Sequence, residues 1–404
     1  MDDLLRQIRD DPRIRAAEHS VSAGDARTLS DQVLLTRIPA PPFAEDARAR
    51  RMASLMVDAG LANVTTDGIG NVLGRFEGAS EGPPIVLSAH LDTVFPAETP
   101  IEVREDSDRL VGPGISDDGR GLTVLLAVAR ALGEAGVQLR SSLLFAATVG
   151  EEGPGNLRGV RHLFGPHGAA RDAAAFVSVD GAGLDRVVTR GVGSRRFRIA
   201  VNGPGGHSWV DWGLANPIHA LGAAVGELAA FAVPTDPPGT LTVARWGGGT
   251  SINAIPQEAW IEVDTRSESE EQLEEVEREL RRAVGRCVAE TRCNPQRRHL
   301  DTEISVLGIR PAGDTPIDAA VVRAAVAATR ALGVEPELCA SSTDANMPMS
   351  VGIPAVTVGG GGSAGMAHTT DEWYRNDRGP NGVLRALFTV LLLCGTADQA
   401  RPAD

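Results

Sequence analysis

The sequence predicts an α/β protein: a mixed, mostly parallel sheet flanked by helices, with a second α+β domain inserted into it. Two observations support this prediction. Unbroken apolar runs such as "PPIVLSAH", "SSLLFAATV" and "AAAFVSVD" alternate with helical patterns, which is typical of parallel strands buried on both faces. From about Gly191 to Gly308 the strands instead alternate polar and apolar residues and follow a different order.

The main domain is expected to be discontinuous, over residues 1–190 and 309–404. In its first part, "AEDARARRMASLMVDAGL" and "GRGLTVLLAVARALGEAG" have helical spacing. Later, the helical pattern "TPIDAAVVRAAVAATRALG" precedes the strand-like "PELCASSTDAN" and "IPAVTVGGG", and a last helix follows. A chain of 404 residues is long enough for two domains with cores of ordinary size.

The inserted segment, residues 191–308, has the β-α-β-β-α-β order of a ferredoxin-like domain. We expect strands at "RRFRIAVNG", "GTLTVARW", "AWIEVDTR" and "TEISVLG". Helices are expected at "NPIHALGAAVGELAAFA" and "SEEQLEEVERELRRAVGRCVAE". The second helix has apolar residues at helical spacing and begins with a Ser269-x-x-Gln272 capping box.

Composition excludes several classes of protein. A net charge of -14 and a pI near 5.1 argue against nucleic acid or an anionic membrane as a partner. All 39 basic residues are arginine, which excludes Schiff-base, pyridoxal-phosphate and P-loop chemistry, because each needs a lysine. The N-terminus has no apolar signal core, no apolar run could span a bilayer, and the four cysteines form no C-x-x-C pair. We therefore expect a cytoplasmic protein with free thiols.

Histidines and acidic residues follow the predicted strands of the main domain. They are His90 and Asp92 after "PIVLSA", Glu151 and Glu152 after "SSLLFAATVG", and Asp180 after "AAAFVSV". Ligands of open α/β sheets bind at the carboxyl ends of strands, so these side chains could converge. Together with Asp117 and His368 they form a set that suits zinc or a similar divalent ion.

Each of these motifs has a simpler alternative when it is taken alone. The Asp117-Asp118 pair could be a solvated turn, and Glu151-Glu152 could be an exposed loop or the start of a helix. What favours a metal site is that all of the motifs fall at strand ends or Gly-rich turns of one domain. The set holds enough ligands for two metal ions.

Several segments, in order along nearly the whole chain, resemble one family of enzymes. They are "SAHLDTVFP", "GPGISDDGRG", "VGEEGPGN", "VSVDG", "GPGGHSW", "GGTSINAIP", "VDTRS" and "HTTDEW". These motifs are similar to those of the dizinc metallopeptidases, which include peptidase T, the glutamate carboxypeptidases, aminoacylase and succinyl-diaminopimelate desuccinylase. "STDAN" and "HTTDEW" most resemble peptidase T. The resemblance implies a zinc exopeptidase-like catalytic domain and an inserted domain that acts as lid and dimerisation domain.

The resemblance also implies a role for each matching residue. His90 and Asp180 would bind one metal ion, Glu152 and His368 the other, and Asp117 would bridge both. Asp92 would orient His90 through a hydrogen bond, and Glu151 would be the general base. Zn²⁺ is the expected metal, with Co²⁺ or Mn²⁺ as alternatives. Many family members have a lysine after the acid pair, but here Gly119-Arg120 follows it, which leaves the implied mechanism intact.

Three further candidates lie in the inserted domain. His207 could be a surface residue of a turn, but the resemblance implies that it reaches an active site, often that of a partner subunit, and stabilises the oxyanion. Asn253 and Arg266 are similar to residues that hold the substrate carboxylate or the oxyanion. Either of these two could instead cap a turn or pair on a strand.

The function implied is a co-catalytic dizinc hydrolase that cleaves an amide bond in short peptides, as a peptidase T-like aminopeptidase. The alternative is a carboxypeptidase or N-acyl-amino-acid amidohydrolase with the same metal site. A homodimer through the inserted domain is expected. A non-catalytic homologue would lack the base or a ligand, yet all are present. A hydrolase with a single metal ion stays open.

Overall fold

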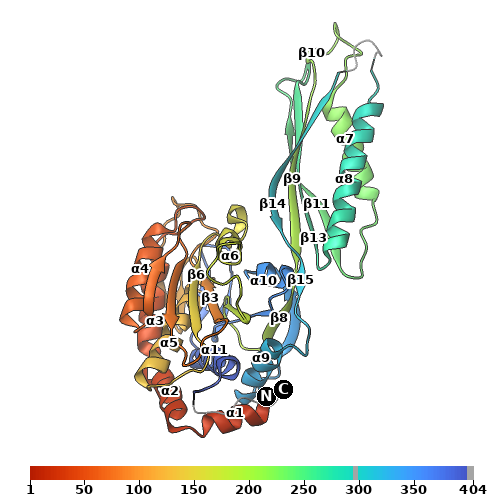
Figure 1. Cartoon of the computed structure of the whole chain (residues 1–404). Helices are drawn as coiled ribbons and strands as arrows, with labels where there is room; N and C mark the ends of the chain where they lie inside the picture. Colours follow the sequence, from red (N-terminus) through yellow and green to blue (C-terminus); the bar gives the residue numbers. More distant parts are fainter. Residues whose placement is uncertain (294–298, 398–404) are drawn as a thin grey trace. The chain divides into compact units, whose positions relative to one another are not determined.

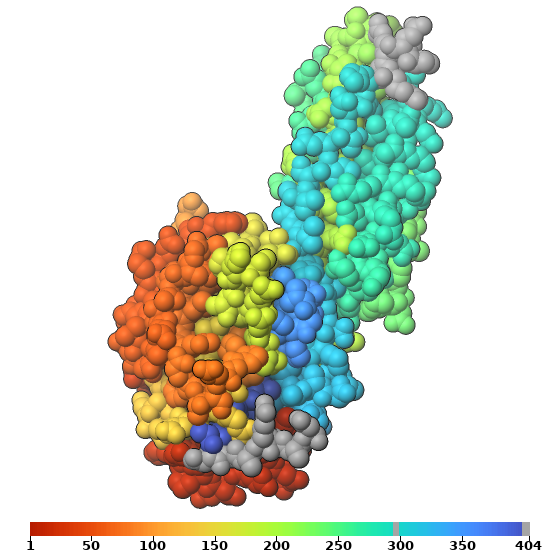
Figure 2. All heavy atoms as spheres, in the orientation of Figure 1, coloured from red at the N-terminus to blue at the C-terminus, as the bar shows by residue number. Residues whose placement is uncertain are grey.

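The computed structural model describes residues 1–293 and 299–397, which form two compact units (Figure 1). Unit 1 comprises Met1–Gly191 and the chain from Asp314 onwards, and unit 2 comprises Val192–Gly313. In unit 1, orange segments from early in the sequence and blue segments from late in it belong to one body (Figure 2). The lid and dimerisation roles of the insertion stay predictions.

The large sheet of unit 1 has the strand order β1-β2-β6-β3-β7-β17-β8-β15, with β16 also paired to β8. The strands are β1 (Ala62–Thr66), β2 (Val72–Phe76), β3 (Ile85–His90), β6 (Leu143–Thr148), β7 (Ala175–Val179), β8 (Arg186–Gly191), β15 (Gly313–Asp314), β16 (Glu337–Ser341) and β17 (Ala355–Val358). The central strands β6, β3, β7 and β17 are parallel to one another, and β16 is parallel to β8. Antiparallel pairs join β1 to β2, β2 to β6 and β8 to β17. The predicted fold class is confirmed.

Helices cover both faces of this sheet, which explains why its central strands are apolar throughout. In β3, Leu87 belongs to the larger core cluster on one face and Val86 to the smaller cluster on the other. The larger cluster is completed by α1 (Asp2–Arg9), α2 (Pro12–Ala23), α3 (Asp25–Thr36), α4 (Asp46–Asp58), α5 (Gly119–Glu134), α9 (Ala320–Ala331) and α11 (Gly379–Cys394). The smaller one is completed by α6 (Arg158–Leu163) and α10 (Asn346–Ser350).

A small antiparallel sheet brings two distant loops of unit 1 together. Its strand order is β18 (Ser363–Gly365), β19 (Trp373–Arg375), β5 (Arg109–Val111) and β4 (Arg104–Asp106). The loop between β18 and β19 carries His368, and the loop after β5 carries Asp117. Pairing of β19 with β5 therefore places these two loops beside each other.

Unit 2 contains one four-stranded antiparallel sheet with the order β11-β13-β9-β14. The elements follow one another as β9 (Gly193–Asn202), α7 (Pro217–Ala230), β11 (Gly239–Gly248), β13 (Glu258–Ser267), α8 (Glu270–Glu290) and β14 (Asp301–Arg310). Phe197, Leu221 and Leu280 belong to the core between sheet and helices. This is the predicted ferredoxin-like arrangement. A short pair, β10 (Gly206–His207) with β12 (Ala254–Ile255), lies outside that sheet.

Only half of the predicted capping box is formed at the start of α8. The Ser269 Oγ accepts a hydrogen bond from the Gln272 N–H at 3.2 Å. The Gln272 amide does not return to the Ser269 N–H, which donates instead to Ser267 Oγ at 3.0 Å. The Gln272 Nε2 donates instead to the carbonyls of Pro234 at 3.0 Å and Pro237 at 3.2 Å.

Candidate active site and metal centre

The carboxyl ends of the parallel strands bring the candidate side chains to one edge of the sheet. His90 is the last residue of β3 and pairs with Thr148, the last residue of β6. The turn after β6 continues into Glu151 and Glu152, followed by the short 3₁₀ helix η1 (Gly153–Gly155). Asp180 directly follows β7, the strand on the other side of β3. This geometry is the reason that residues far apart in sequence meet.

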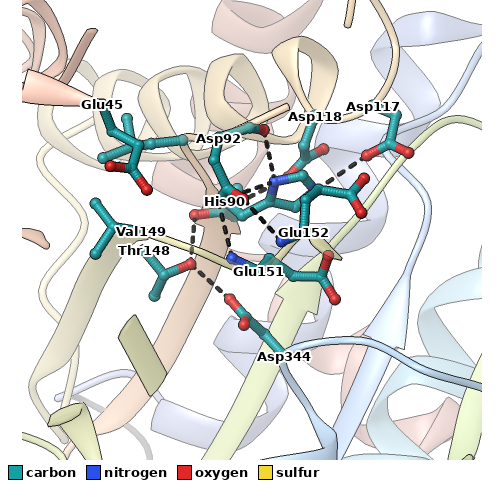
Figure 3. A network of polar contacts seen from close by, with 12 residues as sticks. Glu45, His90, Asp92, Asp117, Asp118, Thr148, Val149, Glu151, Glu152 and Asp344 are labelled. Carbon is teal, nitrogen blue, oxygen red and sulfur yellow. Dashed lines mark hydrogen bonds and ion pairs between the residues drawn. The ribbon is translucent and has the colours of Figure 1, made fainter. Parts of the chain in front are cut away.

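Asp117 lies between two histidines. Its Oδ1 is 3.0 Å from His90 Nε2, and its Oδ2 is 3.1 Å from His368 Nε2. His368 Nε2 is also 3.0 Å from Glu152 Oε1. Figure 3 shows the side chains of His90, Asp117 and Glu152 converging, and their ligand atoms all lie within 4.8 Å of one another.

Asp180 faces the same cavity, which has a volume of about 250 Å³ and is lined by Asp117, Glu152, Asp180 and His368. Burial, together with the charge of Asp117, raises the pKa of Asp180 to about 7. Contacts with Asp117 and Glu152 raise the pKa of His368 to about 10. The two shifts differ in their main cause: burial disfavours the charged form of Asp180, whereas hydrogen bonds to two carboxylates favour the charged form of His368.

The donor set fits a divalent metal ion. His90 Nδ1 lies 2.9 Å from the backbone carbonyl of Asp92, so Nδ1 carries the proton and Nε2 is left to accept. Two imidazoles and three carboxylates at one site are the nitrogen and oxygen ligands that zinc and related divalent ions take. His90, Asp117, Glu152, Asp180 and His368 could therefore hold metal.

Asp92 contacts both His90 and the turn that carries Glu151 and Glu152. Its Oδ1 is 3.7 Å from His90 Nδ1, too far for a hydrogen bond, and its backbone carbonyl contacts the ring instead. The carboxylate accepts from the Glu151 N–H at 2.9 Å and the Glu152 N–H at 2.7 Å (Figure 3). Asp92 thus positions the Glu151-Glu152 turn through its carboxylate, and it contacts His90 through its backbone carbonyl and, at 3.7 Å, through its carboxylate.

An Asp92→Asn substitution is expected to loosen this turn. An amide can accept from only one side, so one of the two N–H groups would face an NH₂ group. We expect the free energy of unfolding to fall by about 1–3 kcal/mol, with turnover reduced and metal retained. Urea unfolding, metal analysis and amide hydrolysis measure the three quantities, with Asp172→Asn, at an exposed position, as the matched control. Parent-like stability and turnover would refute the role of Asp92.

Asp118, which the sequence did not single out, is a buried structural residue. Its carboxylate accepts from the N–H groups of His90 at 3.0 Å, Gly121 at 3.0 Å and Gly181 at 3.2 Å. It caps α5, and burial raises its pKa well above the ordinary value. The alternative of a solvated turn at Asp117-Asp118 is therefore wrong. The sequence signal for the capping role of Asp118 was its position directly before the Gly-rich start of a helix.

Glu372 is a second residue that sequence reasoning missed, although it lies within "HTTDEW". It is fully buried and accepts from the N–H groups of Gly114, Ser116 and Asp117 at 3.0, 2.7 and 2.9 Å. Glu372 therefore holds the loop that presents Asp117. The partners lie more than 250 positions away, so no local pattern indicated them.

A Glu372→Gln substitution is expected to destabilise this loop, because an amide has one acceptor oxygen where the carboxylate has two. We expect the free energy of unfolding to fall by about 1–3 kcal/mol. Chemical denaturation measures the change. The matched control is Asp371→Asn, since the neighbouring Asp371 is exposed and pairs only loosely with Arg104, at 3.6 Å. Equal stability of both variants would contradict the role given to Glu372.

The three candidates of the inserted domain make local contacts within unit 2. The exposed His207 donates its N–H to Asp211 Oδ2 at 2.8 Å, and its Nδ1 accepts from the Trp209 N–H at 3.2 Å. Asn253 Oδ1 accepts from Ser251 Oγ at 2.6 Å, inside a turn. Arg266 Nε donates to Asp264 Oδ2 at 2.9 Å on the same strand. Their roles toward substrate stay predictions.

No helix among the described residues has both the length and the apolar character needed to cross a membrane.

The cluster of imidazoles and carboxylates could hold a metal ion, as the sites of metal-dependent hydrolases do. Residues 86–389 match the peptidase family M20/M25/M40, and the chain therefore belongs to this family. It is a hydrolase that acts on amide bonds. The predicted family resemblance is confirmed.

Known relatives and solved structures agree with this membership. "Uncharacterized protein YqjE" of Bacillus subtilis is 25% identical over 331 residues, which cover 77% of this chain and 81% of the relative. "Putative succinyl-diaminopimelate desuccinylase DapE" of Mycobacterium tuberculosis is 29% identical over 322 residues, covering 76% and 80%.

Among solved structures, a tripeptidase from Staphylococcus aureus has a TM-score of 0.77 at 19% identity, and aminopeptidase PepT from Bacillus cereus has 0.74 at 21%. Each comparison covers 91% of this chain and 98% of the other. The dipeptidase Dug1p of Saccharomyces cerevisiae has a TM-score of 0.68 at 14% identity, covering 95% and 99%. At these identities the likeness shows the shared fold.

Proposed function

We propose that the protein is a dizinc hydrolase of short peptides, an aminopeptidase of the peptidase T type. The observation that supports two metal ions is the position of Asp117, which directs one oxygen to His90 and the other to His368. In this proposal Asp117 would be shared by the two ions. His90 and Asp180 would help to hold one of them, and Glu152 and His368 the other.

When bound, the metal ions supply Lewis acidity toward the scissile carbonyl and the attacking water. Glu151 acts as the general base: it takes a proton from the water and passes it to the leaving nitrogen. Its backbone N–H is held by Asp92 at 2.9 Å, one residue before the ligand Glu152. Glu151 is buried, so the proton transfer takes place away from bulk water.

The residues of unit 2 would act on the substrate rather than on the metal. In this proposal His207 stabilises the oxyanion in the active site of a partner subunit, in a homodimer formed through unit 2. Asn253 and Arg266 hold the oxyanion or the substrate carboxylate. The predicted cytoplasmic location belongs with this proposal and stays a prediction.

A His207→Ala substitution is expected to lower kcat by roughly 10²–10³-fold, because one donor to the oxyanion is removed. Metal content should not change, since His207 is not among the ligands. Steady-state kinetics and metal analysis test both statements. His219→Ala is the control, as His219 is an exposed histidine of the same unit. Unchanged kcat in the His207 variant would refute its role.

A panel of substrates tests the proposed specificity against its alternative. The peptidases among the similar structures favour peptide hydrolysis, whereas the likeness to DapE favours a carboxypeptidase or an N-acyl-amino-acid amidohydrolase. Tripeptides with free, N-acetylated and C-amidated termini should be compared with Zn²⁺, Co²⁺ or Mn²⁺. We expect N-acetylation to abolish cleavage and C-amidation to be tolerated. Preference for N-acylated substrates would support the alternative instead.

A further inference from the structure

The cavity beside the metal cluster has a second wall that holds no candidate ligand. This wall includes Arg186 and Val188 of β8, Ser341 at the end of β16, and Ser342 after it. The strands are parallel, with Glu337 opposite Arg186 and Cys339 opposite Val188. A volume of about 250 Å³ has room for one side chain or a short acyl group next to the reacting amide.

The two walls differ in charge. Asp117, Glu152 and Asp180 line one of them. The other wall contains Arg186. Among the described residues that line this cavity, Arg186 is the only one with a permanent positive charge. The neighbouring Cys339 side chain and the charges of Glu337 and Asp185 raise the pKa of Arg186 above its ordinary value. Arg186 is exposed and lines the cavity.

A buried arginine fixes the backbone on which this wall is built. Arg385 of α11 donates to the carbonyls of Leu184 at 2.5 Å and Arg186 at 3.4 Å. It also donates to the carbonyl of Gly359, another residue that lines the cavity. These bonds join the start of β8 to the end of β17, so the position of Arg186 is set by the core of unit 1.

The remaining wall is held in a similar way. Thr343 and Thr357 both line the cavity, and their hydroxyl oxygens lie 2.7 Å apart. The Thr343 N–H donates to the buried Asn346 Oδ1 at 2.9 Å. The segment that carries Ser341 and Ser342 is therefore anchored at its carboxyl end.

We propose that Arg186 forms a subsite for a carboxylate of the substrate, in the cavity that Ser341 and Ser342 also line. A guanidinium group matches a carboxylate through two parallel hydrogen bonds. The substrates preferred by the enzyme are then amides of acidic amino acids. This inference rests on the proposed amide hydrolysis and names its substrate class.

The first test compares substrates that differ only in carboxylate against carboxamide. Suitable pairs are tripeptides that carry Glu or Gln at the same position. We expect kcat/KM to favour the acid by roughly 10–100-fold in the parent enzyme, the size of a charge-assisted hydrogen bond. Arg186→Met should bring this ratio close to one, and Arg323→Met, at an exposed position of α9, should keep it. No preference in the parent, or the same preference in Arg186→Met, would overturn the proposal.

The second test does not depend on turnover. Calorimetry should show that succinate binds the zinc-loaded protein more tightly than succinamate, by a similar factor, and that Arg186→Met binds both alike. Equal binding of the two ligands to the parent protein would overturn the subsite. If succinate is preferred but no amide is hydrolysed, the proposed function fails and the subsite stands. If amides are hydrolysed without any acid preference, only the subsite fails.

Discussion

A Glu151→Gln variant is expected to bind metal as the parent does and to lose amide hydrolysis by roughly 10²–10⁴-fold. Glutamine has nearly the same size and shape as glutamate but cannot take a proton from water. The bond from its backbone N–H to Asp92 would remain, so the turn should keep its position. Metal analysis of the purified protein and single-turnover hydrolysis measure the two effects separately.

The result distinguishes two roles for Glu151, general base and metal ligand. Glu81→Gln is the matched control because Glu81 is an exposed glutamate of the same unit. If the Glu151 variant turns over like the control, Glu151 is not the base. If it loses metal instead, Glu151 binds the ion and the division of labour with Glu152 is wrong.

An Asp117→Asn variant is expected to lose both metal and activity. The substitution removes the charge shared between His90 and His368, and an amide is a poorer ligand than a carboxylate. Metal affinity should fall by more than the roughly 10–100-fold that is usual when an outer partner of a metal ligand is removed. Titration with a competing zinc chelator measures the affinity.

Asp318→Asn is the control for this variant, since Asp318 is an exposed aspartate of unit 1. It should bind metal and hydrolyse amides as the parent does. An Asp117→Asn protein with parent-like affinity for two ions would show that Asp117 is not the bridging residue.

The central sheet and the position of the cluster could be predicted because they follow from local patterns. Apolar runs without interruption indicate strands buried on both faces, and polar residues directly after such runs must lie at one edge of a parallel sheet. His90, Glu152 and Asp180 all meet this description. His368 does not follow a strand of that sheet, and its prediction as a ligand depended on the motif "HTTDEW" alone.

Contacts between distant loops could not be predicted. Asp92 bonds to a turn about 60 residues away, and Glu372 to a loop more than 250 residues away, so neither choice of partner leaves a local signal. Arg186 is the first residue of an ordinary strand, and only the cavity shows that it faces the cluster. In unit 2, Asn253 makes a contact within a turn and Arg266 pairs on its own strand. Both contacts are among the simpler alternatives to a role in substrate binding.

The most direct test of the proposed dizinc site is zinc titration of the chelator-treated protein while hydrolysis of a tripeptide is followed. We predict no hydrolysis without metal and a rise in rate that reaches its plateau at about two ions per chain. A plateau at one ion would contradict the second site. Full hydrolysis by the metal-stripped protein would contradict the metal-dependent mechanism itself.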